Sequence, residues 1–104
     1  MNVTVTAWIT ESSPTARFAE LVRRWKRDTA LTSSIAKVSM HSAYQEIIGM
    51  GARALPLIFE ELEQRGGDWF WALRAITGED PARGSSDFDE AKRAWLDWWR
   101  DRAS

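Results

Sequence analysis

The sequence predicts an all-α fold, a compact bundle of about five helices. Its 104 residues leave room for one core rather than two. Hydrophobic residues make up 44% and charged residues 28%, which is typical of a folded globular domain. Every strongly patterned segment repeats its apolar residues at helical spacing. We therefore expect residues 13–104 to form one helical domain, preceded by a flexible or extended N-terminal arm at 1–12. The alternative for the arm is a strand that pairs across a dimer.

The first helix is predicted at residues 14–28. Ser13 is a suitable N-cap, and Pro14 is tolerated in the first helical turn. The apolar stripe of this helix consists of Phe18, Leu21, Val22 and Trp25. Residues 29–40 are rich in serine and threonine and lack a clean period, so we expect a loop with one short turn around Ile35 and Val38.

Two helices are expected next. Ser42-x-x-Gln45 has the form of a capping box, and His41 and Ser42 together are interpreted as a helix cap. Glycines 49 and 51 end this short helix, and a proline at position 56 suits the first turn of the following one. The buried side of the third helix is predicted to hold Leu55, Ile58, Phe59 and Leu62.

The last two helices complete the bundle. Gly66-Gly67 ends the third helix, Asp68 is a plausible N-cap for the fourth, and Gly78 closes it. The fifth begins at Asp87-x-x-Glu90 or Ser86-x-x-Asp89 and ends near residue 101. We expect it to bury apolar side chains from Phe88, Ala91, Trp95, Leu96, Trp98 and Trp99.

Residues 51–78 resemble one unit of a HEAT-like helical repeat. The segment has the order helix, glycine turn, helix, with Pro56-Leu57 in the first helix and Ala72-Leu73 in the second. No second copy of the unit occurs at a period of 30 to 45 residues, whereas a solenoid needs about three units to be stable. The resemblance therefore implies a helical hairpin within a compact bundle.

A wider pattern covers roughly residues 25–100. Its three parts are HSAYQEIIGMG from His41, WFWALRAITGEDP from Trp69 and AWLDW from Ala94. This pattern resembles a group of short bacterial proteins of uncharacterised activity, which usually have proline where this chain has Ser42. The resemblance implies a stand-alone bacterial domain, and it implies no function for any single residue.

Composition excludes several kinds of chemistry. With no cysteine, the chain has no disulfide scaffold, thiolate metal site or cysteine nucleophile. His41 is the only histidine, the acidic residues lack the spacing of a calcium loop, and no phosphate-binding loop is present. We expect no enzyme activity and no cofactor or metal. Without a signal peptide or a long apolar run, a cytoplasmic protein that does not bind membranes is predicted.

Charge is distributed unevenly along the chain. Residues 1–40 hold six basic and three acidic side chains, whereas residues 41–104 hold eight basic and twelve acidic ones. The basic cluster of the first helix consists of Arg23, Arg24, Lys26 and Arg27. This cluster suits an acidic protein surface or the phosphates of a nucleic acid. The sequence pI of about 5.8 favours the protein surface.

Seven tryptophans are the most unusual feature of the composition. The helical stripes place Trp25, Trp69 and Trp95 in the core. Trp71, Trp98 and Trp99 cannot all be buried beside them, because residues one or two positions apart point about 100° or 200° apart. Tryptophan is enriched at the centres of protein interfaces, although a small core also uses large side chains.

These observations favour a non-enzymatic protein-interaction module, such as a small antitoxin, inhibitor or adaptor. Its partner would be another protein or a second copy of itself. The candidate contact residues are Trp71, Trp98, Trp99, Arg23, Arg24, Lys26 and Arg27. The alternative is a nucleic-acid-associated regulator that binds phosphates through the basic first helix.

Overall fold

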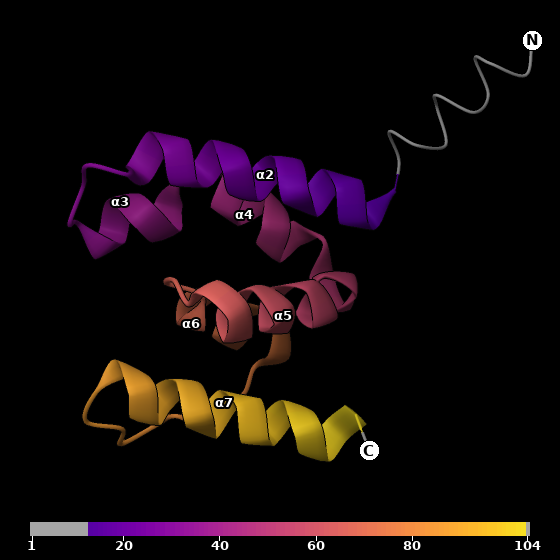
Figure 1. Ribbon diagram of the computed structural model, residues 1–104, viewed down its shortest axis with the longest axis vertical. Coiled ribbons are helices and arrows are strands. Elements are labelled where there is room, and N and C mark those ends of the chain that lie inside the picture. Colours follow the sequence, from indigo (N-terminus) through magenta and orange to yellow (C-terminus); the bar gives the residue numbers. More distant parts are fainter. Residues whose placement is uncertain (1–12, 104) are drawn as a thin grey trace, which may run out of the picture.

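The computed structural model describes residues 13–103, and the expected arm at 1–12 lies outside this range. The described chain forms six α-helices and one 3-10 turn, without a strand, so the all-α prediction is confirmed (Figure 1). The elements are α2 (Pro14–Thr29), α3 (Ile35–Met40), α4 (Ser42–Gly49), η1 (Gly51–Ala54), α5 (Leu55–Arg65), α6 (Phe70–Thr77) and α7 (Phe88–Ala103).

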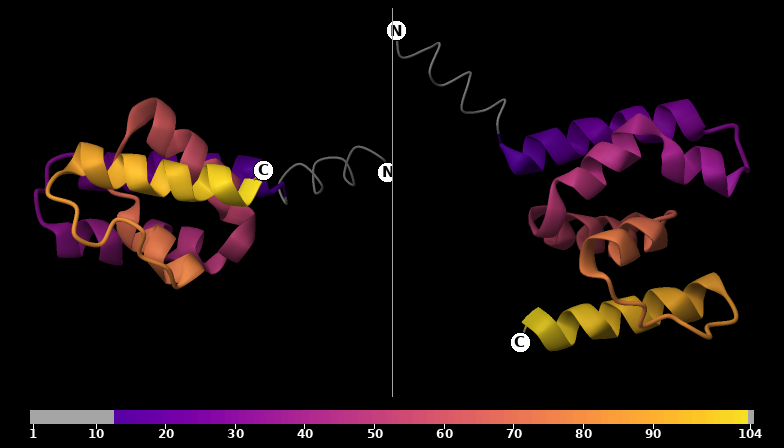
Figure 2. Two further views of the ribbon diagram at one scale, coloured as in Figure 1. Left: turned by 90° about the horizontal axis from the view of Figure 1, so that it is seen from below. Right: turned by 180° about the vertical axis from the view of Figure 1, so that it is seen from behind.

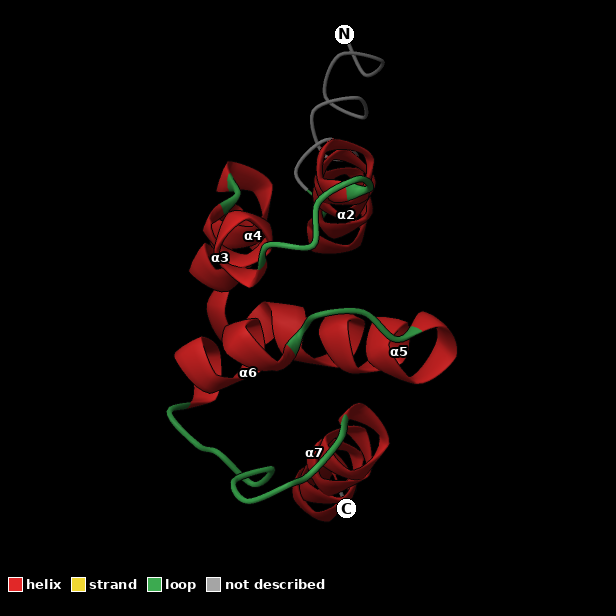
Figure 3. Cartoon of the chain, turned by 90° about the vertical axis from the view of Figure 1, so that its left-hand side faces the viewer, coloured by secondary structure: helices red, strands yellow, loops and turns green. Residues whose placement is uncertain are grey.

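The helices lie in three tiers. Helices α2, α3 and α4 form one tier, α5 and α6 occupy the middle tier, and α7 covers the far side (Figures 1 and 3). Helix α4 packs against α2, α3 and α6, whereas α7 packs mainly against α5. The loop from α6 descends to the tier of α7 and runs along that helix to its start, as the view from behind shows (Figure 2). Helix α6 has one packed face and one outward face, because Ala72 and Leu73 are buried whereas Trp71 is exposed.

The main core is an aromatic cluster between α2, α4 and the start of α6. The Trp25 ring lies 5.1 Å from Tyr44 and 4.8 Å from Trp69, between ring centroids. Phe18 stacks on Trp69 at 5.8 Å. The predicted stripe of the first helix is confirmed, because all four of its apolar residues are buried. Burying aromatic side chains of this size is a main source of stability in so small a domain.

A second aromatic cluster joins α5 to α7. Phe59 stacks on Trp99 at 4.8 Å and on Trp98 at 6.1 Å, and it lies 6.2 Å from Trp95. Trp95 is fully buried, as its helical stripe predicts. Phe88, which was expected on the same buried side, is 40% exposed and instead lies against Phe70 at the start of α6.

The segment expected to be a loop at residues 29–40 contains a sixth helix. Its N-cap is Ser34, whose hydroxyl accepts a hydrogen bond from the Lys37 amide at 3.3 Å. The Trp25 indole donates to the Val38 carbonyl at 2.9 Å and joins this helix to α2. A helix of six residues is marginal alone, so a tertiary contact of this kind is needed to stabilise it.

The expected capping box of the second helix is wrong in detail. The N-cap is His41, whose Nδ1 accepts a hydrogen bond from the Ala43 amide at 3.0 Å. Gln45 does not complete a box with Ser42, because its side chain donates to the Ser39 carbonyl at 2.7 Å. The capping box of Ser42 and Gln45 is therefore absent, whereas the interpretation of His41 as part of the helix cap is confirmed.

Candidate functional site

The outer face of α6 carries the most exposed tryptophan of the described chain. Trp71 is 51% exposed, whereas its neighbours Ala72 and Leu73 are completely buried. Residues three, four and seven positions after Trp71 share its side of the helix. This outer face therefore consists of Trp71, Arg74, Ala75 and Gly78.

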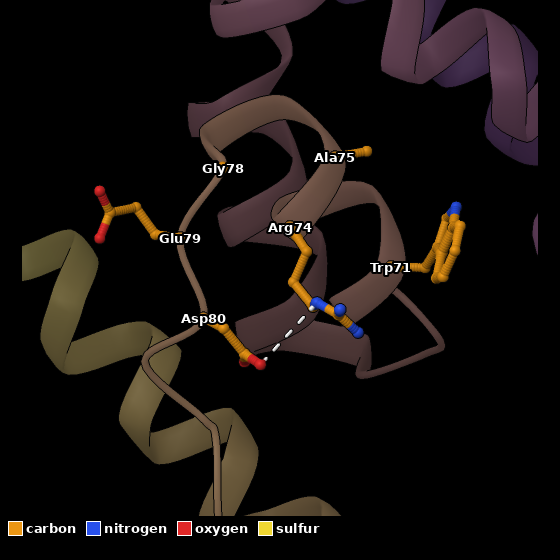
Figure 4. A pocket seen from close by; sticks show the side chains of 6 residues that line it. All are labelled: Trp71, Arg74, Ala75, Gly78, Glu79 and Asp80. Atoms are coloured by element: carbon orange, nitrogen blue, oxygen red, sulfur yellow. Dashed lines mark ion pairs between the residues drawn. The ribbon is translucent and has the colours of Figure 1, made fainter.

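A hollow of about 270 Å³ lies along this face. We call it the α6 hollow, and it is lined by Trp71, Arg74, Ala75, Gly78, Glu79 and Asp80 (Figure 4). The Trp71 indole projects from the helix at one end, and the Glu79 carboxylate points away from it at the other. Ala75 and Gly78 have little or no side chain, which leaves room for an incoming group.

Arg74 is held loosely in the α6 hollow. Its Nε lies 3.9 Å from Asp80 Oδ2, and its Cζ lies 5.8 Å from the centre of the Trp71 ring. The side chain remains 53% exposed. Within residues 13–103, no hydrogen bond engages its two terminal nitrogens. Arg74 is therefore oriented by an indole and a carboxylate, with its best hydrogen-bond donors still open to a partner.

The start of α6 is fixed by a residue from α4. The Tyr44 hydroxyl donates to the Asp68 carbonyl at 2.8 Å and accepts from the Ala72 amide at 2.9 Å. Burial raises the pKa of Tyr44 well above its usual value, with the nearby Asp68 charge as a smaller cause. Asp68 was expected to cap α6, but the N-cap position is Trp69 and no local side chain bonds there. Tyr44 takes over that role and so positions the turn that carries Trp71.

A second, smaller hollow lies on the other side of Trp71. Its volume is about 170 Å³, and its lining residues are Val38, Ser39, Tyr44, Asp68, Phe70 and Trp71. The indole thus stands between two hollows, one facing α3 and one facing the α6–α7 loop. Trp71 therefore borders both hollows, while the Arg74 guanidinium lies over its ring at 5.8 Å from the ring centre.

The basic cluster of α2 is engaged within the fold. Arg24 Nη2 lies 2.7 Å from Glu46 on α4, and Lys26 Nζ pairs with Glu61 on α5. Arg27 pairs with the adjacent Asp28 at 3.1 Å, and Arg23 lies 3.8 Å from Glu20. The four cations therefore do not form one uncompensated patch. Arg23 and Lys26 also line a groove of about 350 Å³ between α2 and α5, together with acidic residues of α5.

Trp98 and Trp99 are half-buried rather than open. Both rings stack on Phe59, and the Arg102 guanidinium covers Trp98 at 4.3 Å from the ring centre. The chain's own side chains thus occupy most of their surface. Of the three candidate tryptophans, only Trp71 stands in the open.

His41 forms a hydrogen bond through each ring nitrogen. Nδ1 accepts from the Ala43 amide, so Nε2 carries the proton and donates to Asp28 Oδ2 at 2.9 Å. This bond, followed by the one from Arg27, lowers the pKa of Asp28 below its ordinary value. A general base needs a free nitrogen facing a substrate proton, and here that nitrogen is occupied by a helix cap.

Comparison with known proteins adds no relative to this description. No family model, no curated protein and no solved structure matches the chain. The resemblance to short bacterial proteins therefore stays a prediction. Within residues 13–103, no cluster of three or more potential ligands could hold a metal ion, and no helix has the length and apolarity to cross a bilayer.

Proposed function

We propose that the protein is a non-enzymatic interaction module that binds a protein partner through the outer face of α6. The observation that carries this proposal is the pair Trp71 and Arg74, one helical turn apart and both about half exposed. Tryptophan and arginine are the residue types most enriched at binding hot spots. A small inhibitor, antitoxin or adaptor would use a surface of this kind.

The size of the hollow favours a protein partner over a small molecule. Pockets that enclose a drug-sized ligand have volumes of about 300–1,000 Å³ and bury most of the ligand. The α6 hollow, at about 270 Å³, lies at the lower edge of this range and is open along an exposed helix face, so it would leave much of a small ligand uncovered. It suits one protruding side chain of a partner, with the rest of the partner resting on the surrounding surface.

The ion pairs of α2 weigh against the nucleic-acid alternative. Phosphate binding draws on basic side chains that release counterions when they meet the nucleic acid. In this fold Arg24 and Lys26 face carboxylates of Glu46 and Glu61. A phosphate would have to displace these partners or accept their repulsion. The net charge of −1 does not offset this cost.

The test compares partners retained by three forms of the immobilised protein. Wild type, Trp71→Ala and Leu31→Ala are each exposed to lysate of the native cells and to untagged copies of the chain, and bound proteins are quantified by mass spectrometry. Leu31 is a matched control, because it is fully exposed but lines neither hollow. We expect one protein to be retained by wild type and Leu31→Ala and lost from Trp71→Ala. If no retained protein depends on Trp71, the proposal is wrong.

A further inference from the structure

The outer face of α6 carries both a projecting side chain and a hollow. A two-fold dimer interface uses the same patch on both copies, so the patch must contain both members of every complementary pair. Here a projecting indole, Trp71, and a hollow floored by Ala75 and Gly78 lie on one helix face (Figure 4). Two copies facing each other across a two-fold axis can each place the indole in the other's hollow.

The charges on this surface are complementary to themselves as well. Arg74 and Asp80 lie side by side but are only loosely paired, at 3.9 Å. Across a two-fold axis, Arg74 of one copy would meet Asp80 of the other, and the reverse contact would form at the same time. The open terminal nitrogens of Arg74 favour a closer, bidentate contact with that carboxylate. Glu79 also lines the hollow, but its carboxylate points away from Arg74.

We propose that the occupant of the α6 hollow is a second copy of this chain, in a two-fold symmetric dimer. Each Trp71 packs over Ala75 and Gly78 of the other copy, and two Arg74–Asp80 contacts cross the interface. This inference rests on the proposed function, because it assigns a partner to the same surface. The hollow involves six residues, whereas a standard interface uses about 20–30 residues on each side. We therefore expect a weak, reversible and salt-sensitive dimer.

Complementary charge variants give a sharp test. Arg74→Asp makes the patch acidic, and Asp80→Arg makes it basic, so each variant alone sets like charges against each other in the dimer. An equal mixture of the two restores both cross-interface pairs. We expect each variant to sediment as a monomer and the mixture to form a dimer. Trp71→Ala should stay monomeric, both alone and when it is mixed with either charge variant.

Sedimentation velocity from micromolar to millimolar protein measures this association. The matched control is Arg53→Asp, which reverses an exposed charge on η1 outside the α6 hollow and should dimerise like wild type. Circular dichroism establishes that each variant is folded. A wild type that stays monomeric throughout would overturn the inference, as would a mixture that fails to associate or a Trp71→Ala variant that dimerises normally.

The two proposals fail in distinguishable ways. If wild type is monomeric but a lysate protein binds in a Trp71-dependent manner, the second copy is the wrong occupant and the interaction module stands. If neither self-association nor capture depends on Trp71, both proposals fall. If Trp71→Ala still dimerises and substitutions on a different surface abolish the dimer, the assignment of the dimer interface to α6 is wrong.

Discussion

Replacing Tyr44 with phenylalanine removes one oxygen atom that joins α4 to α6. Tyr44 is completely buried, and its hydroxyl bonds the Asp68 carbonyl and the Ala72 amide. Phenylalanine keeps the stacked contact with Trp69, at 5.8 Å between ring centroids. The buried Ala72 amide loses its acceptor, and an unsatisfied buried donor costs about 1–3 kcal/mol. We therefore expect Tyr44→Phe to lower the free energy of unfolding by about 2 kcal/mol at neutral pH.

The same residue makes stability depend on alkaline pH. Tyr44 is the only tyrosine, and burial raises its pKa in the folded state. A raised folded pKa means that the contribution to stability is complete below the unfolded value, about 10, and is lost as pH rises above it. The slope of this loss approaches about 1.4 kcal/mol per pH unit. The Tyr44→Phe variant lacks this slope, so its stability should converge on that of wild type at high pH.

Urea unfolding at a series of pH values from neutral to strongly alkaline measures both effects. Thr77→Val is the control, because it removes another hydroxyl of α6, bonded to the Leu73 carbonyl at 2.7 Å, but no titrating group. Its difference from wild type should stay constant with pH. A Tyr44→Phe variant as stable as wild type at neutral pH, or a difference that persists unchanged at high pH, would refute the reasoning.

Three further substitutions test the packing and the caps by chemical denaturation. Gly67→Ala should lower the free energy of unfolding by about 1–3 kcal/mol, because Gly67 has φ +106° and a Cβ there would lie 3.2 Å from Trp69 Nε1. The control is Gly49→Ala, which has open space around it at the end of α4 and should raise the free energy of unfolding by about 0.5–1 kcal/mol. Phe59→Ala should cost about 3–5 kcal/mol and increase acrylamide quenching of the tryptophans that stack on it, and a loss near zero would mean that α7 does not depend on this cluster. His41→Ala should cost about 1 kcal/mol, and His41→Asn should recover most of it, which a role unrelated to capping would not predict.

Helix positions were predictable because their signals are local. Phe18 and Trp25 repeat at helical spacing and both lie in the core. The short helix after α2 was missed because residues 35–40 are too few to show a period, and the bond from Trp25 to Val38 that joins it to α2 spans 13 positions. Periodicity detects a helix that has a continuous stripe, not one that depends on a distant partner.

Helix caps and ion pairs were predicted less well, because their partners are also distant in the sequence. Asp68 is a suitable N-cap by residue type, but the Tyr44 hydroxyl accepts a hydrogen bond from the Ala72 amide of α6 across 28 positions. The cluster around Arg24 is obvious in the sequence, whereas its pairing with Glu46 follows from the packing of α2 on α4. A count of basic residues therefore overstates the positive field that a partner would meet.

The tryptophans show when the angle between two side chains around a helix axis predicts which of them is buried. Trp69 and Trp71 lie about 200° apart around one helix axis, so burying the first exposes the second, and the structure has this arrangement. Trp98 and Trp99 lie only about 100° apart, and one ring of Phe59 stacks on both. The ring of Phe59 is thus large enough to cover part of both indoles, which the angle between Trp98 and Trp99 alone does not predict.

The α6 hollow depends on a feature that lies outside helical periodicity. Gly78 ends α6 in the left-handed conformation, at φ 71°, and its amide bonds the Arg74 carbonyl at 2.8 Å. This turn reverses the chain, so that Asp80 returns to the side of the helix from which Arg74 projects. Glycine adopts this conformation without strain, whereas other residues do so at a cost. The residue that ends the helix thereby also brings a carboxylate beside the arginine, and the oppositely charged pair on which the proposed dimer depends follows from the helix C-cap.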